Sequence, residues 1–190
     1  MSLVRQVLGP LVRAGRRTSD RLLHPWRRRS ALARLQRHRM PRGVLFVCHG
    51  NICRSPYAEG VFRTHLGAGG DAVIRIRSAG FIGPDRPSPR FAIDEAAARG
   101  VDLSGHRSSL LSAAELRQVE LVVVMEPAQA EALRHHFRFA GTVLVLADLD
   151  PVSDGGRVIL DPVDQSRAVF AASYQRIDRC VGELVRLLAG

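Results

Sequence analysis

The sequence is poor in the residues that mark secreted, membrane-spanning and metal-binding proteins. It has only three cysteines in 190 residues, which excludes a fully paired disulfide framework. No apolar run approaches the length of a transmembrane helix, and the first forty residues lack the uninterrupted apolar core of a secretory signal. The histidine pair His135 and His136 has no further ligands at metal-binding spacing, so we expect no metal and no other cofactor.

Lysine is absent, and all 28 basic residues are arginine. Residues 1–42 hold 12 arginines and one acid, Asp20, for a charge of +11, whereas residues 43–190 hold 16 arginines and 17 acids, for a charge of −1. These sum to the net charge of +10. We therefore expect no nucleic-acid-binding face on residues 43–190, and we assign any anionic partner to residues 1–42.

A strand, a tight loop and a helix are predicted around Cys48. The apolar run Val44–Val47 leads to this cysteine, Gly50 and Asn51 tolerate a curled backbone, and Arg54 opens a helical pattern. Backbone amides that converge in such a loop, beside a helix N-terminus, bind anions and favour a thiolate. The pattern predicts a nucleophilic thiol below a phosphate-binding loop of His49, Gly50, Asn51, Ile52 and Cys53.

Cysteine and arginine at this spacing also occur by chance in an arginine-rich chain. Cys180 and Arg186 stand six apart as well, but no strand precedes them. Helical spacing of apolar residues around Cys180 predicts a small core residue on a terminal helix. Context, and not spacing, therefore selects Cys48 and Arg54.

Apolar runs alternate with helical patterns over residues 43–190, which predicts one domain after an Arg-rich extension of residues 1–42. Such alternation predicts an α/β fold, a three-layer sandwich with a central four-stranded parallel sheet and its ligand at the carboxyl ends of the strands. We expect strands near residues 44–47, 73–78, 121–125 and 142–146, and helices near residues 56–66, 89–99, 115–118, 127–136 and 166–188.

The segment Val44–Pro56 closely resembles the opening of the low-molecular-weight protein tyrosine phosphatases of bacterial type. The resemblance continues in order through Arg77–Gly80, Asp102–Arg107 and Leu121–Met125 to the pair Asp161-Pro162. It covers residues 43–190 and implies a flavodoxin-like fold.

The resemblance also implies roles for individual residues. Cys48 would attack phosphorus, Arg54 would bind the phosphoryl oxygens, and Asp161 would act as general acid and base. Ser55 would stabilise the thiolate, and Cys53 would form a reversible disulfide under peroxide. Asn51, Ser78 and His106 would hold the loop by mutual hydrogen bonds.

Two Asp-Pro pairs compete for the role of the acid. The residues alone leave Asp150-Pro151 and Asp161-Pro162 open. The resemblance favours Asp161, because the family places its acid just before the last helix.

The sequence predicts the substrate less clearly than it predicts the phosphatase reaction. Phe81 is the one obvious ring where the family places rim aromatics, and Tyr57 is a second candidate. Phosphotyrosine on proteins is the substrate that the resemblance implies, with bacterial tyrosine kinases of polysaccharide export as potential partners. The alternatives are a protein arginine phosphatase, whose branch favours threonine at Ile52, an arsenate reductase, which needs further cysteines, and a noncatalytic phosphate-binding adaptor.

The extension allows three interpretations. It is a disordered arm, because Gly9, Pro10 and Pro25 interrupt its helical spacing, or it contacts an anionic surface through Arg27–Arg29, or translation begins at Met40. The required thiolate suits a reducing compartment, so we expect a cytoplasmic protein.

Overall fold

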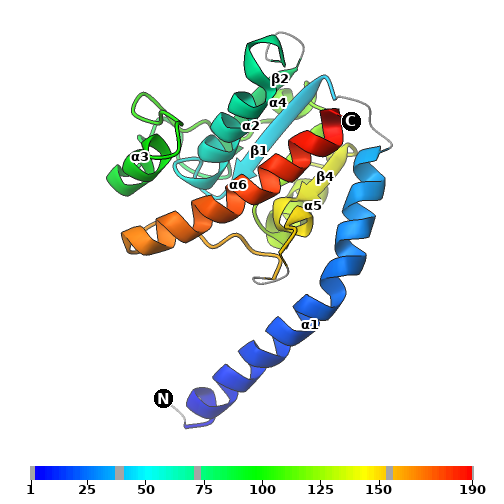
Figure 1. The fold of residues 1–190 in the computed structure, drawn as a ribbon, viewed down its shortest axis with the longest axis vertical. Coiled ribbons are helices and arrows are strands. Elements are labelled where there is room, and N and C mark those ends of the chain that lie inside the picture. The colour runs from blue at the N-terminus through cyan, green and yellow to red at the C-terminus, as the bar shows by residue number, and fades with distance from the viewer. Residues whose placement is uncertain (1–2, 37–40, 71–73, 153–155, 190) are drawn as a thin grey trace.

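The computed structural model describes residues 3–36, 41–70, 74–152 and 156–189. Four parallel strands form the sheet in the order β2-β1-β3-β4. They are β1 (Gly43–Cys48), β2 (Arg75–Gly80), β3 (Leu121–Val124) and β4 (Thr142–Val145). The expected α/β three-layer fold is confirmed (Figure 1).

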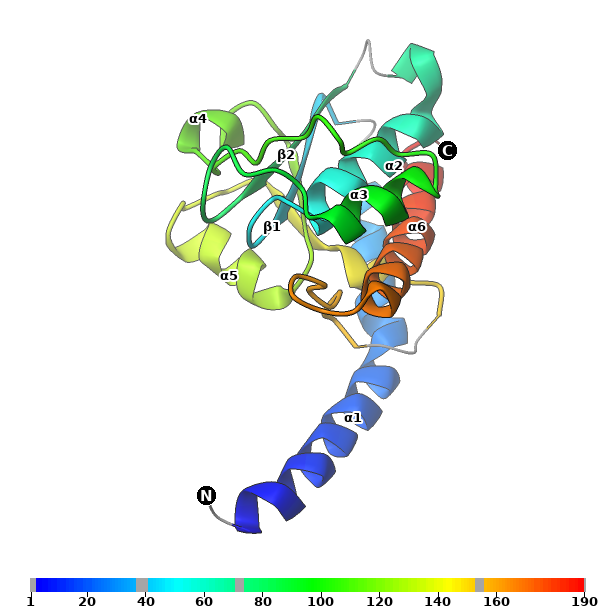
Figure 2. The same cartoon turned by 90° about the vertical axis from the view of Figure 1, so that its left-hand side faces the viewer.

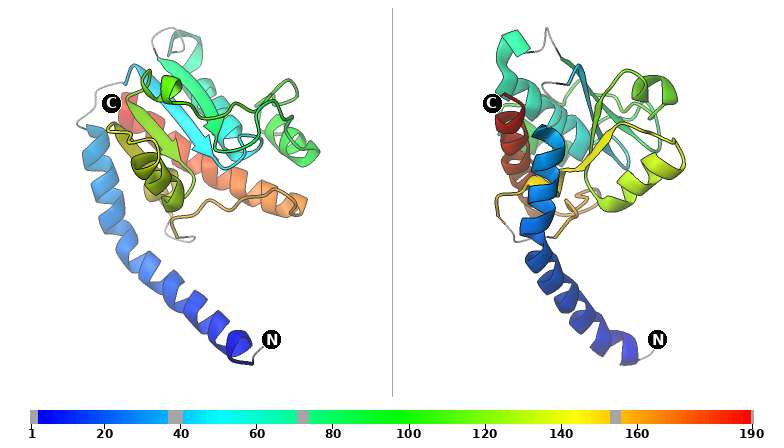
Figure 3. Two further views of the ribbon diagram at one scale, coloured as in Figure 1. Left: turned by 180° about the vertical axis from the view of Figure 1, so that it is seen from behind. Right: turned by 90° about the vertical axis from the view of Figure 1, so that its right-hand side faces the viewer.

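Helices cover both faces of the sheet. On one face α2 (Arg54–Gly70) and α6 (Arg167–Ala189) pack together, and on the other α5 (Pro127–His135) packs against β3 and β4 (Figures 2 and 3). The short helices α3 (Arg90–Ala97), α4 (Ala113–Leu116) and the 3-10 helix η1 (Leu146–Leu149) complete the domain. All residues of β1 and β3 are buried, as expected of central parallel strands covered on both sides.

The strand order creates the crevice that a ligand site needs. From β1 the chain crosses to β2 on one side, and the next strand, β3, lies on the other side of β1. Loops at the carboxyl ends of such strands diverge, and ligands bind where they part. Cys48 is the last residue of β1 and therefore lies at this point.

The predicted boundaries agree with the structure to within a few residues. The second strand was expected from Val73, which lies outside the described residues, as does Met40. The helix expected to end at Leu66 breaks at Gly67, whose φ of 68° favours glycine.

The Arg-rich extension contains a helix, α1 (Leu3–Gln36). A disordered arm was one of the three interpretations of its sequence. The helix continues through Pro10 and Pro25, which we had expected to interrupt it. Its second half packs on η1 and α6, with Ala31 and Leu35 buried, and tertiary packing of this kind outweighs weak local helix propensity. No helix within the described residues has the length and apolarity needed to cross a bilayer.

Candidate active site

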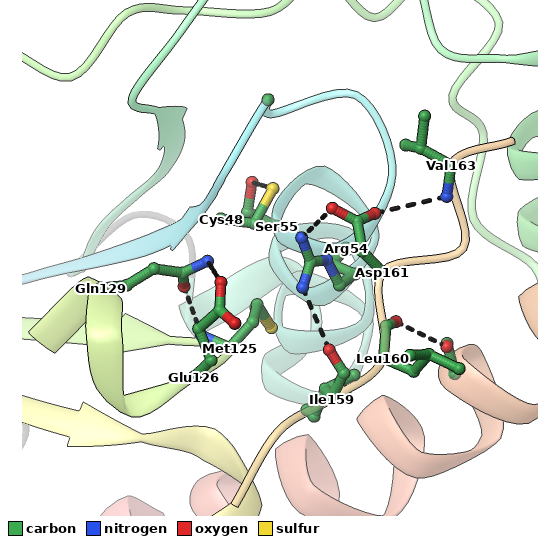
Figure 4. A network of polar contacts seen from close by, with 12 residues as sticks. Cys48, Arg54, Ser55, Met125, Glu126, Gln129, Ile159, Leu160, Asp161 and Val163 are labelled. Atoms are coloured by element: carbon green, nitrogen blue, oxygen red, sulfur yellow. Dashed lines mark hydrogen bonds and ion pairs between the residues drawn. The ribbon is translucent and has the colours of Figure 1, made fainter. Parts of the chain in front are cut away.

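The Cys48 thiol lies at the floor of a curled loop between β1 and α2. Its Sγ accepts a hydrogen bond from the Ser55 hydroxyl at 3.1 Å (Figure 4) and another from the Asn51 amide at 3.2 Å. The side chain is buried, with 2% of the residue exposed. Two donors directed at one sulfur hold it in a fixed position at the floor of the loop.

Asn51 fixes the shape of this loop. Its backbone has a φ of 51°, a left-handed conformation that asparagine tolerates better than most residues. Its side-chain amide donates to Ser55 Oγ at 2.9 Å, and its Oδ1 accepts from the Ser109 amide at 2.8 Å. His106 Nε2 donates to the Asn51 carbonyl at 2.7 Å. The loop is thus tied to its own helix and to the segment after Gly105.

Ser78 does not take part in this network. It lies in β2 opposite Phe46 and is buried, and among the described residues no hydrogen bond joins its hydroxyl to the loop. The contact that the resemblance implied for Ser78 is made instead by the Ser109 amide, which sequence reasoning missed because a backbone donor leaves no signature in the sequence.

Gly80 and Arg86 support the loop from outside. A Cβ atom on Gly80 would lie 2.8 Å from both the Asn51 nitrogen and the Gly50 carbonyl carbon, so only glycine allows this approach. Arg86 Nη2 donates to the Gly50 carbonyl at 2.9 Å, and its Nε donates to the Gly83 carbonyl at 3.0 Å. Nothing in the sequence distinguishes Arg86 from the other arginines, of which the chain has 28 in all.

Arg54, the first residue of α2, is 2% exposed and lines the same pocket as Cys48. Nη1 donates to the Ile159 carbonyl at 3.0 Å, and Nη2 forms an ion pair with the Asp161 carboxylate (Figure 4). Nε is buried and has no hydrogen-bond partner among the described residues. An unpaired buried N–H costs free energy, and an anion above the loop would satisfy it.

The two competing carboxylates lie in different surroundings. Asp161 is 39% exposed beside Arg54, and its Oδ1 accepts from the Val163 amide at 3.3 Å. Asp150 is fully buried and bonded to Arg176 at 2.9 Å and Arg179 at 3.1 Å. Asp161 is thus the member of the pair that reaches the loop.

The ionisation of Asp150 follows from its partners. Burial acts to raise its pKa, but hydrogen bonds from Arg179, the Val152 amide and Arg176 outweigh burial and hold the pKa below its ordinary value. Asp150 is therefore a buried carboxylate held by arginines.

A chain of backbone contacts positions the segment that carries Asp161. The Ile159 amide donates to the Met125 carbonyl at 2.9 Å, at the end of β3, while the Ile159 carbonyl accepts from Arg54. The Met125 amide in turn donates to Gln129 Oε1 at 2.9 Å (Figure 4). Gln129, a buried polar residue in α5, is a second support that sequence reasoning missed.

These groups surround a pocket with a volume of about 130 Å³. Its apolar lining is formed by Ile52, Ile82 and Val163, and His49, which also lines the pocket, is exposed. Phe81, the ring expected at the rim, is not among the lining residues and contacts Phe137 at a centroid distance of 6.2 Å. The complete lining is Cys48, His49, Gly50, Ile52, Cys53, Arg54, Ile82, Arg86, Asp161 and Val163.

Tyr57, the other expected rim residue, is buried beneath the loop. Its ring stacks on Tyr174 at a centroid distance of 3.8 Å, and its hydroxyl donates to Asp178 at 2.5 Å. Tyr174 donates to the Cys53 carbonyl at 3.3 Å. Burial raises the pKa of both phenols, so both stay protonated and serve as donors.

The remaining cysteines differ in position. Cys53 lines the pocket, and burial together with the nearby Cys48 raises the pKa of its thiol well above the usual range. Cys180 is fully buried on α6, as predicted, and does not line this pocket. The described residues contain no group of three or more His, Cys, Asp or Glu side chains suited to a metal ion.

Known proteins share this arrangement of sequence and fold. A family profile described as low molecular weight phosphotyrosine protein phosphatase matches residues 43–189. The low molecular weight protein-tyrosine-phosphatase Etp of Escherichia coli strain K12 is 33% identical over 150 residues, which cover 77% of this chain and 94% of Etp.

A second relative and a solved structure extend the comparison. The protein-arginine-phosphatase of Bacillus subtilis strain 168 is 27% identical over 147 residues, which cover 76% of this chain and 95% of that protein. The structure of Vibrio vulnificus Wzb in complex with benzylphosphonate has a TM-score of 0.64 and 30% identity, covering 76% of this chain and 97% of that one.

Proposed function

The chain belongs to the low molecular weight phosphotyrosine protein phosphatase family and is a cysteine-dependent phosphatase, and we propose that it hydrolyses phosphotyrosine on proteins through a phosphocysteine intermediate. The observation that carries this proposal is the meeting of Cys48, Arg54 and Asp161 around one small pocket.

The first step is attack by Cys48. Its thiolate forms a bond to phosphorus while the bond from phosphorus to the tyrosine oxygen breaks. The Asn51 amide and Ser55 hydroxyl hold the sulfur in place. Arg54 Nε supplies one phosphoryl contact, and Nη2 supplies a second by exchanging the Asp161 carboxylate for a phosphoryl oxygen, in a fork that lysine cannot reproduce.

Asp161 completes both steps. When the phosphoryl group displaces it from Arg54, the Asp161 carboxylate takes up a proton from solvent and, as a carboxylic acid, donates that proton to the leaving phenolate, which would otherwise depart as a strong base. In the second step the same carboxylate removes a proton from the water that attacks the phosphocysteine, and inorganic phosphate and free Cys48 result. Its exposure and its place at the pocket rim support this assignment.

Loop rigidity supports the rate. Asn51, Ser55 and His106 keep the amides of residues 49–53 in one orientation, so little reorganisation precedes binding. We include Ser78 as a packing support of β2 only, because its hydroxyl has no bond to the loop among the described residues. No step requires a metal or an organic cofactor.

The pocket walls favour an aromatic phosphate ester. Ile52, Ile82 and Val163 offer apolar surface for a phenyl ring above the phosphate site. Phosphoarginine is the second candidate substrate, since one relative is named a protein-arginine-phosphatase. Ile52, where the resemblance places threonine in the arginine branch, favours phosphotyrosine.

The proposed setting follows from the chemistry. A thiolate nucleophile suits a reducing compartment, so we propose the cytoplasm. The proposed partner is a phosphotyrosine-bearing protein, and bacterial tyrosine kinases of polysaccharide export are the first to test. Residues 43–190 form the proposed catalytic domain, and residues 1–42 form its extension.

Turnover of phosphorylated substrates tests the proposal. We expect vanadate-sensitive hydrolysis of p-nitrophenyl phosphate that is lost in Cys48→Ser and kept in Cys180→Ala, a thiol outside the pocket. A phosphotyrosine peptide should be hydrolysed with a larger kcat/KM than a phosphoarginine peptide. The reverse order would assign arginine phosphatase activity, and full activity of Cys48→Ser would overturn the phosphocysteine route.

A further inference from the structure

Helix α1 has two unlike faces. On the inner face Ala31 and Leu35 are buried, His24 donates to the Asp150 carbonyl at 2.8 Å, and Arg28 forms an ion pair with Glu183. On the outer face Leu22 is 77% exposed and Trp26, one turn further along, is 70% exposed. A tryptophan and a leucine one turn apart form an apolar patch that the protein itself leaves uncovered.

The apolar pattern of the outer face extends upstream in the sequence. Val4 and Leu8 precede Leu22 and Trp26 by 18 positions, which is about five turns at 3.6 residues per turn and returns to the same side of a helix. We call the exposed pair Leu22 and Trp26 the outer stripe. The first half of α1 extends away from the catalytic domain in each view (Figures 1 and 2). Helix α1 as a whole is about 51 Å long.

The charge of α1 indicates which kind of partner can cover the outer stripe. Its 34 residues include nine arginines and a single acid, Asp20, which is ion-paired with Arg27 at 2.7 Å. Two such helices would repel each other, which disfavours a second copy of this chain. Arginines spread along the full helix, with an apolar stripe between them, match an extended anionic surface better than a local acidic patch on a protein.

We propose that α1 lies in the plane of an anionic lipid bilayer, with the outer stripe at the boundary of headgroups and acyl chains and exposed arginines beside it, such as Arg29, among the lipid phosphates. Tryptophan and leucine exposed on one side of an arginine-rich helix are typical of helices that rest at this interface. The inner face keeps its contacts to η1 and α6 in the bound state, so the catalytic domain is held at the surface by the second half of the helix.

Trp26 is the single tryptophan of the chain and reports directly on its own environment. The test uses full-length protein with vesicles of phosphatidylcholine alone or with added phosphatidylglycerol. We expect the Trp26 emission to move to shorter wavelength only with the anionic vesicles, and the fraction that sediments with them to rise on the order of tenfold or more. Unchanged emission would overturn the proposal.

Matched variants separate the stripe from the charge. Leu22→Gln and Trp26→Gln should each lower vesicle binding, whereas Leu110→Gln, a leucine 48% exposed outside α1, should not. Hydrolysis of p-nitrophenyl phosphate should be equal in all three, which shows that they fold. If the stripe variants bind as wild type does, attraction is by charge alone and the proposal is wrong.

Two further outcomes would also overturn it. Soluble polyglutamate serves as a charge-only probe, and a shift of Trp26 emission as large as that with vesicles would favour an acidic protein partner. A dimer that Trp26→Gln dissociates, without lipid binding by the wild type, would assign the stripe to self-association.

Discussion

The substitution Asp161→Asn separates proton transfer from phosphate binding. In the free protein the Asp161 carboxylate is ion-paired with Arg54, the residue that we propose grips the phosphoryl group. Asparagine keeps the size of the side chain but removes the charge and the exchangeable proton. The two consequences have opposite signs: the leaving group loses its acid, while Arg54 loses a competitor for phosphate.

The structure sets the scale of each effect. A positioned general acid typically contributes about 10²–10⁴-fold, or about 3–5 kcal/mol of barrier. Asp161 is 39% exposed, so solvent screens its pairing with Arg54 and the pair is worth about 1 kcal/mol or less. We therefore expect kcat/KM for phosphotyrosine to fall by at least about a hundredfold, while inorganic phosphate binds up to about fivefold more tightly.

The assay compares aryl phosphates of graded leaving-group basicity, because an acid matters most when the leaving group is a strong base. kcat/KM reports the step that forms phosphocysteine, and it should depend more steeply on leaving-group pKa in Asp161→Asn than in wild type. Asp164→Asn removes an equal charge from an exposed neighbour and serves as the control. An unchanged dependence in Asp161→Asn, or weaker phosphate binding, would refute the assignment.

Three further predictions follow from the contacts around the site. The pKa of Asp150 is lowered in the folded protein, so its ionised form stabilises the fold at pH values above the unfolded pKa of about 3.9. This stabilisation is lost as the pH falls through the folded pKa. In Asp150→Asn the free energy of unfolding, measured in urea, should therefore depend less on pH below about pH 4 than in wild type. After peroxide the sulfenic acid of Cys48 can condense with Cys53 to a disulfide and water, so a reductant should restore activity in wild type and much less in Cys53→Ser, and equal recovery would remove Cys53 from this role. Gly80→Ala should push the Asn51 loop outward and lower kcat/KM more than the melting temperature, since the added Cβ meets backbone 2.8 Å away, and an unchanged kcat/KM would contradict this.

The central strands were predictable because they are apolar on both faces. Runs such as those of β1 and β3 predict fully buried parallel strands, whereas the first half of β2 alternates exposed arginines with buried residues. The limits of α4 were expected at residues 115–118 and lie two residues earlier, because the capping box of Ser112 and Glu115, which starts the helix, was overlooked. The helix over Pro25 was not predictable, since burial of Ala31 and Leu35 depends on distant residues.

Some residues of the site could likewise be predicted from the sequence, and others could not. Cys48, Arg54 and Ser55 are near in sequence, so their grouping was readable from one segment. Asp161 needed the family resemblance to distinguish it from Asp150, because both precede proline and only the fold shows which one is held by arginines.

The supports that were missed act through the backbone or from distant segments. The Ser109 amide, Arg86 and Gln129 reach the site from loops and a helix far along the chain. Nothing in their local sequence marks them.

Asp150 joins three parts of the chain at one residue. Its carboxylate holds α6, its carbonyl accepts a hydrogen bond from His24 of α1, and eleven residues later the same segment presents Asp161 to Arg54. Asp150 is thus the residue at which α1 and α6 are both anchored. A change at the contact of α1 with Asp150 therefore acts on the residue that also holds α6.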